Sequence, residues 1–188
     1  MMLTPAQARM AARRRRQGGY TLIELIIASA IGLLVMSALT SVVLTMTIGA
    51  NTATSRVEAS AQIRNFQFTA YDDFALSRPP APSGCGTPSS PCTTQTMVLM
   101  GDRMPNETGG VPVPFTARYT WDQSQQTVTR FVGSGSRVAA SSVTSFSWYV
   151  DTSAPHPVVV VSLTVTVSAN GTPFSESQTL LFYPRVTS

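Results

Sequence analysis

The feature that most constrains this chain is an uninterrupted apolar run from Leu25 to Ala50. Its 26 residues include no charged side chain and no proline. At a rise of about 1.5 Å per residue, a helix of this length spans about 39 Å, which exceeds the roughly 30 Å of a bilayer's hydrocarbon layer. The run therefore predicts one membrane-spanning helix, and a chain of 188 residues leaves room for one further domain after it.

A cleaved secretory signal is the first alternative to this anchor. Such a signal has an apolar core of about 7–15 residues that ends at a small-residue cleavage site. Ala28, Ser29 and Ala30 imitate that site, but the apolar run continues for 20 residues beyond them, and Glu24 stands just before the run. The pattern therefore favours an anchor.

The net charge of +4 is unevenly distributed along the chain. Residues 1–19 hold five arginines and no acid, whereas residues 20–188 hold eight arginines and nine acids, a net charge of −1. Because the arginines precede the span, we expect the N-terminus in the cytoplasm and the chain beyond about residue 52 on the far side of the membrane. The near-neutral remainder argues against strong nucleic-acid binding, although a local patch of Arg118, Arg130 and Arg137 stays open.

Beyond the span, residues 51–76 keep a helical period. One apolar stripe recurs at steps of three and four residues, and it consists of Ala59, Ile63, Phe66, Ala70 and Phe74. We expect this amphipathic segment to continue the helix and pack on a domain, with the aromatic residues Phe66, Phe68, Tyr71 and Phe74 all in the core. Arg78-Pro79-Pro80 should end the helix.

From about residue 96 the apolar period changes to two, which predicts strands. The predicted strands are Thr96–Met100, Pro114–Trp121, Thr127–Val132, Val143–Val150, Val158–Ser168 and Gln178–Tyr183. Residues 121–126 should form one hairpin turn, and Asn170-Gly171 should join the last pair. Val158–Ser168 begins as a continuous apolar run, which suits a central strand packed on the helix. The predicted fold class is α+β, a long N-terminal helix packed on an antiparallel sheet.

Few residues of this chain are candidates for catalysis, metal binding or disulfide formation. Cys85 and Cys92 lie in a Pro- and Gly-rich loop, and a local disulfide is the first interpretation, with free thiols as the alternative; two Cys and one His do not complete a zinc site. His156 stands between two prolines without a nucleophile motif nearby. Asp102, Asn106 and Glu107 could ligate calcium, but a solvated turn explains them better. We therefore predict no catalytic residue, no metal, no cofactor and no enzymatic activity.

Glu24 is the residue that needs an explanation. A lone carboxylate in a bilayer costs about 2.5–3.5 kcal/mol on insertion scales, so it should either reach water at the interface or have a partner. Its context is RRRRQGGYTLIEL, residues 13–25. Basic residues, Gly-Gly, an aromatic residue and Glu five residues after the second glycine resemble a type IV prepilin leader. The resemblance covers residues 13–48, with Tyr20 in place of the commoner phenylalanine and without the proline that kinks the helix of many major pilins.

That resemblance implies a processing pathway. Prepilin peptidase would cut between Gly19 and Tyr20, the new α-amino group of Tyr20 would be N-methylated, and Glu24 would be the fifth residue of the mature chain. In assembly, Glu24 of an incoming subunit would then approach the amine of its neighbour. Pairing two otherwise isolated charges would favour one axial offset between subunits.

The rest of the chain resembles a subgroup less sharply. Residues 118–122, 128–130 and 143–149 are similar to segments of minor pilins of the W type and pseudopilins of the J type. We therefore expect a leader at 1–19, a transmembrane and filament-core helix at 20–50, its amphipathic continuation at 51–76 and a β-rich head at 77–188.

The expected role is that of a minor structural subunit of a type IV pilus, serving initiation, adhesion or DNA uptake. The expected partners are prepilin peptidase, other pilin subunits and the inner membrane. The alternatives are a pseudopilin of a type II secretion system, a ligand- or DNA-binding module at a filament tip, and an unprocessed single-span protein.

Overall fold

The computed structural model describes residues 20–81, 83–94, 96–103, 110–153, 155–169 and 172–184. The predicted leader, residues 1–19, lies outside this part of the chain. The protein divides into two compact units, Met1–Ile48 and Gly49–Ser188.

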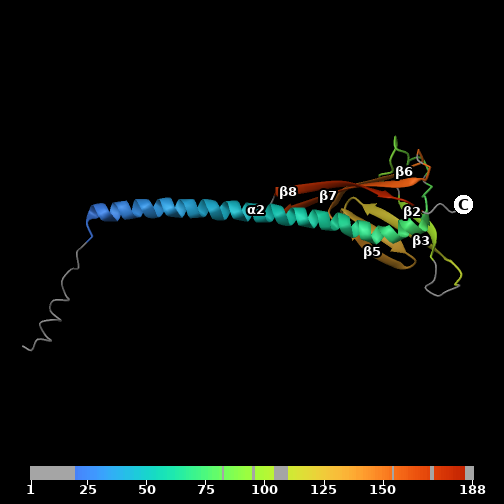
Figure 1. Ribbon diagram of the computed structural model, residues 1–188, viewed down its shortest axis with the longest axis horizontal. Helices are drawn as coiled ribbons and strands as arrows, with labels where there is room; N and C mark the ends of the chain where they lie inside the picture. The colour runs from blue at the N-terminus through green and yellow to red at the C-terminus, as the bar shows by residue number, and fades with distance from the viewer. Residues whose placement is uncertain are drawn as a thin grey trace, which may run out of the picture. The chain divides into compact units, whose positions relative to one another are not determined.

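One long helix, α2, runs from Leu22 to Leu76 (Figure 1). In the first unit every described side chain of this helix is exposed, as expected for a segment whose solvent is lipid. Five of its hydroxyl side chains in this unit donate hydrogen bonds to carbonyls of the preceding turn, as in Ser29 to Ile26 at 2.9 Å and Thr40 to Met36 at 2.8 Å. These bonds let serine and threonine occupy an apolar helix without unpaired polar groups.

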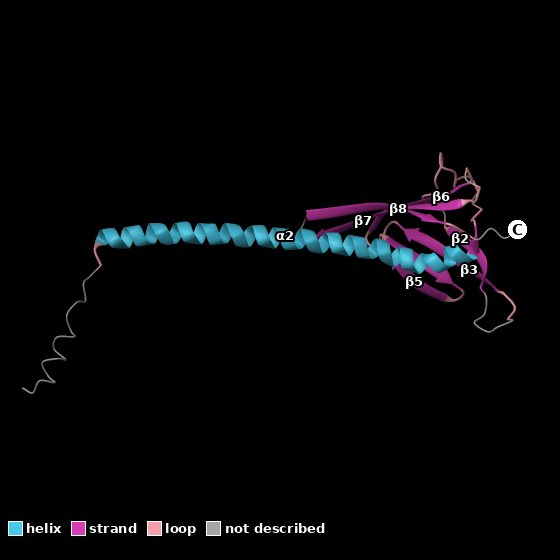
Figure 2. Cartoon of the chain, viewed as in Figure 1, coloured by secondary structure: helices cyan, strands magenta, loops and turns pink. Residues whose placement is uncertain are grey.

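The second unit contains two antiparallel sheets (Figure 2). The five-stranded sheet has the order β1-β2-β3-β4-β5, with β1 at Ser77–Arg78, β2 at Met97–Arg103, β3 at Val113–Asp122, β4 at Thr127–Val132 and β5 at Gly135–Ala140. The three-stranded sheet has the order β6-β7-β8, with β6 at Val143–Asp151, β7 at Val158–Ala169 and β8 at Thr172–Phe182. The predicted α+β class is confirmed, and the strand predicted to be central, β7, lies at the centre of its sheet.

The sheets differ from the prediction in several details. The strands form two sheets instead of one. β5 was not predicted, because its segment GSRVAA offers a glycine and two alanines, which strands disfavour. β8 begins at Thr172 instead of Gln178, because its Pro- and Ser-rich first half pairs with β7 in continuous register from Ala169↔Thr172 onward. The turn dipeptide Asn170-Gly171 lies outside the described residues.

The hairpin between β3 and β4 follows the prediction. Asp122 ends β3, and its carboxylate accepts hydrogen bonds from the Ser124 backbone N–H at 2.9 Å, the Ser124 hydroxyl at 2.7 Å and the Gln125 N–H at 3.0 Å. These bonds lower the pKa of Asp122 below its usual value, and the bond from the Ser124 hydroxyl has the largest effect. A short polar side chain at the strand end thus satisfies the turn's backbone donors.

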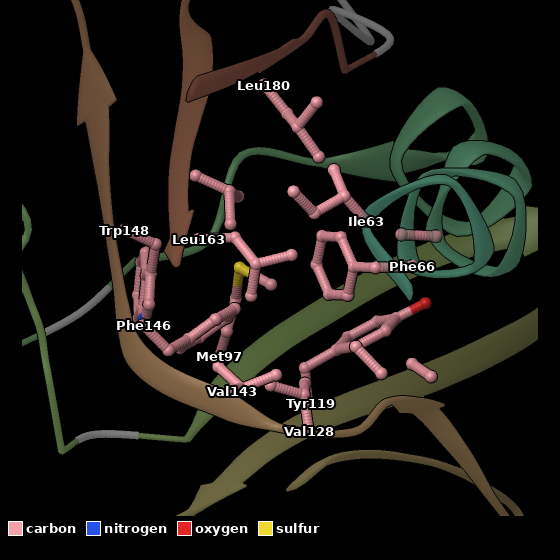
Figure 3. Packing of buried hydrophobic residues seen from close by; sticks show 14 of the residues in the cluster. Ile63, Phe66, Met97, Tyr119, Val128, Val143, Phe146, Trp148, Leu163 and Leu180 are labelled. Carbon is pink, nitrogen blue, oxygen red and sulfur yellow. The ribbon is translucent and has the colours of Figure 1, made fainter. Parts of the chain in front are cut away.

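The core of the second unit forms where the predicted helical stripe meets both sheets. Figure 3 shows Ile63 and Phe66 of α2 pointing toward side chains of both sheets, among them Tyr119 and Leu163. The Phe66 ring meets those of Tyr119 and Phe146 edge to face, with centroids 5.8 and 5.9 Å apart. The predicted burial of the whole stripe is confirmed, since its five members are at most 1% exposed.

Two of the four aromatic residues assigned to the core are not in it. Phe68 is 82% exposed and Tyr71 62% exposed, whereas Phe66 and Phe74 are buried. The reason is helical geometry, because Phe68 lies about 200° around the helix from Phe66 and Tyr71 about 100° from Ala70. The helical period of the stripe therefore predicts which side chains are buried better than aromatic character does.

Candidate functional site

The N-terminal end of α2 is closed by its own side chains. The backbone N–H and the hydroxyl of Thr21 each donate to the Glu24 carboxylate at 3.0 Å, and the Glu24 N–H donates to the Thr21 hydroxyl at 3.3 Å. The first helical bond runs from the Leu25 N–H to the Thr21 carbonyl at 3.2 Å. This reciprocal arrangement is a capping box, in which Thr21 is the N-cap and Glu24 the third helical residue.

The capping box changes the interpretation of Glu24. Its carboxylate accepts two hydrogen bonds within its own chain and lies where the helix dipole favours negative charge. A partner from another subunit is therefore not required to explain why an acid stands there. The signal was present in the sequence as Thr-x-x-Glu before an apolar run, a spacing that the interpretation of Glu24 as a lone carboxylate overlooked.

The predicted processing site lies next to this cap. Tyr20 precedes the N-cap and is 87% exposed, while Gly19 lies outside the described residues. By length and apolar composition, α2 is long enough to cross a membrane. A free amine at Tyr20 would thus stand four residues before a carboxylate held in place by Thr21.

A second polar cluster, which was not predicted from the sequence, lies at the other end of the helix. Asp73 is fully buried and accepts hydrogen bonds from Arg130 at 2.5 and 2.7 Å, Arg103 at 3.0 Å and the Tyr119 hydroxyl at 2.7 Å. These donors come from β4, β2 and β3. The signal was an acid seven residues after Phe66, that is, at a position of the stripe where an apolar residue is expected.

Electrostatics at this cluster follow from burial and from the Asp73 charge. Burial and then the nearby Asp73 charge raise the pKa of Tyr119 well above its usual value near 10. The hydrogen bonds that Arg130 donates to Asp73 raise the pKa of Arg130 above its own usual value, which is already high. Among the described residues, no buried side-chain nitrogen or oxygen lacks a partner. A fully satisfied cluster without a free acid or base fits a structural role.

The remaining candidate residues fall into separate places. Cys85 and Cys92 are joined by a disulfide with Cα atoms 5.1 Å apart. His156 is exposed in the loop between β6 and β7, and Asp102 lies near the end of β2. Asn106 and Glu107 fall outside the described residues. Within the part of the chain that the structure describes, no group of three His, Cys, Asp or Glu side chains could hold a metal ion.

The three arginines suggested as a patch are not brought together on one face. Arg130 turns toward the helix and binds Asp73. Arg118 lies on the opposite face of the sheet, 5.9 Å from the Phe131 ring, because its neighbours Ala117 and Tyr119 are buried. Arg137 pairs in register with Arg130 and so shares the face of Arg130, not that of Arg118.

Fold and site together define a class: a subunit with an apolar N-terminal helix that fits membrane anchoring and an α+β unit that carries two antiparallel sheets. Residues 14–40 match the family described as the prokaryotic N-terminal methylation motif. No curated protein and no solved structure matches the chain. With this motif directly before and along its apolar helix, the chain is a type IV prepilin-like protein, and the motif implies processing by prepilin peptidase and assembly with other pilin subunits.

Proposed function

We propose that this protein is a minor structural subunit of a type IV pilus. It is stored in the bacterial inner membrane with its N-terminus in the cytoplasm and residues beyond about 52 on the far side. Prepilin peptidase cuts between Gly19 and Tyr20, and Tyr20 is N-methylated. The mature chain then enters the filament through its apolar helix and acts structurally, without catalysis.

The observation that carries this proposal is the coincidence of the methylation motif with the start of α2. The motif spans residues 14–40, and the described helix begins at Leu22, three residues beyond the proposed cut. The cut would therefore leave a short N-terminal segment of Tyr20 and Thr21 ahead of a capped helix. A peptidase could reach an unwound segment there, whereas the backbone of a helix is closed by its own hydrogen bonds.

Residues 118–122 and 143–149 are similar both to minor pilins of the W type and to pseudopilins of the J type. The choice between a pilus and a type II secretion system is therefore tested by the phenotype of a deletion. Deletion of this gene should remove or shorten surface pili and leave protein secretion intact. Loss of secretion with normal pili would assign the subunit to the secretion machine instead.

The first experiment is intact-mass and N-terminal analysis of the protein from membranes, with and without prepilin peptidase. We expect a chain that starts at N-methylated Tyr20 only where the peptidase is present. A chain that retains Arg13 to Arg16 in both strains would contradict the proposal, and Glu24 would then be only a helix-capping acid at the interface.

A glycine variant gives this experiment its matched control. Gly19→Val places a branched side chain directly before the cut and should leave the leader attached. Gly49→Val changes the same residue type outside the matched segment, at a position with no atom within 4 Å of an added Cβ, and should be processed normally. Processing of both variants would contradict a cut after Gly19.

A further inference from the structure

β6 is an edge strand of its sheet, but its outer edge is not open. The three-stranded sheet has the order β6-β7-β8, so β7 pairs with only one side of β6. On the other side, the Cys92 N–H donates to the Trp148 carbonyl at 2.8 Å and the Trp148 N–H donates to the Cys92 carbonyl at 2.9 Å. The Val150 N–H donates to the Gly86 carbonyl at 2.9 Å. Residues 83–94, here called the strap, thus cover this edge.

The strap is shaped by its own turn and by the disulfide. The Gly86 N–H donates to the Ser90 carbonyl at 2.7 Å, and the Ser90 N–H donates to the Thr87 carbonyl at 3.0 Å. Gly86 has a φ of 92°, in the region that only glycine adopts readily. The disulfide from Cys85 to Cys92 closes this turn, so the two backbone segments that meet β6 are held next to each other.

The covered edge is one that a protein has reason to protect. β6 carries Phe146, Trp148 and Tyr149 in a nine-residue segment without a basic residue or proline. Open edges of such strands expose unpaired N–H and C=O groups that pair with other chains. Cys92 and Trp148 are each only 1% exposed, so the strap also completes the core at this point.

The other sheet protects its edge differently. Near the end of β5, the Asn65 side chain donates to the Ala139 carbonyl at 2.9 Å, and the Ser141 N–H donates to the Gln62 side chain at 3.0 Å. Those bonds come from helix side chains and do not depend on a covalent link. The strap that covers β6, in contrast, contains a disulfide, which thiols can reduce.

We propose that the Cys85–Cys92 disulfide is a redox latch that holds the strap on the β6 edge and that its reduction opens this edge. In reduction, a dithiol gives two electrons and two protons to the disulfide; the S–S bond breaks, two cysteine thiols form, and the dithiol itself becomes a disulfide. The latch lies wholly within the second unit.

Backbone geometry supplies an internal control for this latch. In an antiparallel ladder successive N–H groups point to opposite sides of the strand. The backbone N–H groups of Trp148 and Val150 point toward the strap. The N–H group of Tyr149, which lies between them and pairs with Val160, therefore points toward β7. Opening the strap alone should therefore expose two amides and leave their neighbour protected.

The test is residue-level hydrogen exchange on the full chain in detergent micelles, with and without a phosphine reductant. We expect reduction to speed exchange of the Trp148 and Val150 amides at least about tenfold, while Tyr149 changes little. Unchanged exchange at Trp148 and Val150 would overturn the proposal, because the strap would then stay closed without its disulfide. Equal acceleration at Tyr149 would also overturn it, because the disulfide would then stabilise the sheet as a whole.

A variant separates the bond from the reagent. Cys85→Ser combined with Cys92→Ser should show the reduced pattern from the start and should not respond to the reductant. A reductant response in this variant would attribute the effect to the reagent and overturn the latch. If the variant does not fold, the oxidised and reduced wild-type chains still decide the question.

Discussion

Asp73 shows how a single residue fixes the end of the long helix on the five-stranded sheet. Its carboxylate is buried and accepts hydrogen bonds from side chains of three different strands. A buried carboxylate without partners would cost several kcal/mol, whereas three donors, two of them cationic, satisfy it in full. The helix can therefore end in this place and in this rotation only with Arg103, Tyr119 and Arg130 aligned to meet it.

Replacing Asp73 by asparagine should destabilise the second unit by about 2–4 kcal/mol, because two arginines and a tyrosine lose their acceptor charge. The lower part of this range applies because Arg103 and Arg130 keep 43% and 21% side-chain exposure and can rehydrate. Urea unfolding of the full chain in micelles, followed by tryptophan fluorescence, measures the change. Asp72→Asn, at an exposed neighbouring position, is the control and should be nearly neutral. Equal effects of the two substitutions would show that the cluster adds no stability.

Tyr119 gives the same cluster a pH dependence. Its pKa is raised in the folded chain above the usual 10.0, so the unfolded chain loses this proton first as the pH rises. The unfolded state then binds fewer protons than the folded state, and stability falls with increasing pH. The contribution is present in full below about pH 10 and declines above it.

Tyr119→Phe should therefore lower the free energy of unfolding by about 1–2 kcal/mol at neutral pH, because the hydrogen bond to Asp73 is lost. It should also flatten the decline in stability above about pH 10, up to about pH 12. Urea titrations across this range compare the variant with the wild type and with Tyr149→Phe, a tyrosine outside the cluster. Parallel pH profiles for the wild type and Tyr119→Phe would contradict the assigned role.

At the scale of elements, the end of α2 is set by a close approach to β2. A Cβ added to Gly101 would lie 2.0 Å from the Leu76 carbonyl oxygen, far inside van der Waals contact. Gly101 pairs with Ser77 in the β1–β2 ladder. The last carbonyl of the helix therefore rests on a strand position that only glycine can occupy.

Gly101→Ala should destabilise the second unit by about 2 kcal/mol or more, since backbone atoms on both sides must move to admit a methyl group. Gly135→Ala is the matched control, because a Cβ there meets nothing closer than 3.5 Å. Thermal or urea unfolding compares the two. A Gly101→Ala chain as stable as Gly135→Ala would show that the helix end can shift away from β2 at little cost.

Structure that follows from a regular sequence period could be predicted from the sequence. Local side-chain contacts could be predicted in part. The stripe from Ala59 to Phe74 gave the buried face of α2, because a helix of 3.6 residues per turn admits one such face. The central position of β7 followed from its continuous apolar run. The capping box at Thr21 and Glu24 was also readable, since its residues lie within one turn.

Contacts between distant segments could not be predicted in this way. Asp73 meets Arg130 across 57 positions, and the strap meets β6 through backbone atoms that carry no sequence signal. β5 escaped prediction because its pairing with β4, not its residues, makes it a strand. The division into two sheets likewise depends on which strands pair, and period-two patterns do not specify partners.

At the scale of the molecule, the two units carry different features. The first unit holds the methylation motif and the exposed apolar helix, which suit processing and lateral association in a membrane. The second unit is stabilised by its own core, its Asp73 cluster and its disulfide. Substitutions at Asp73 or Gly101 should therefore act on stability, whereas substitutions at Glu24 should act on assembly.

Glu24 can be tested so that helix capping and charge pairing are separated. Gln at the third helical position still completes a capping box but carries no charge, whereas alanine removes both functions. If Glu24 pairs with the Tyr20 amine of a neighbouring subunit, Glu24→Gln and Glu24→Ala should both prevent incorporation into filaments. Only Glu24→Ala should loosen the first turn, by about 1 kcal/mol at most. Immunoblots of sheared filaments measure incorporation, and hydrogen exchange at the first helical amides measures capping. Normal incorporation of Glu24→Gln, with failure of Glu24→Ala, would instead make Glu24 a capping residue, because the charge would then be dispensable.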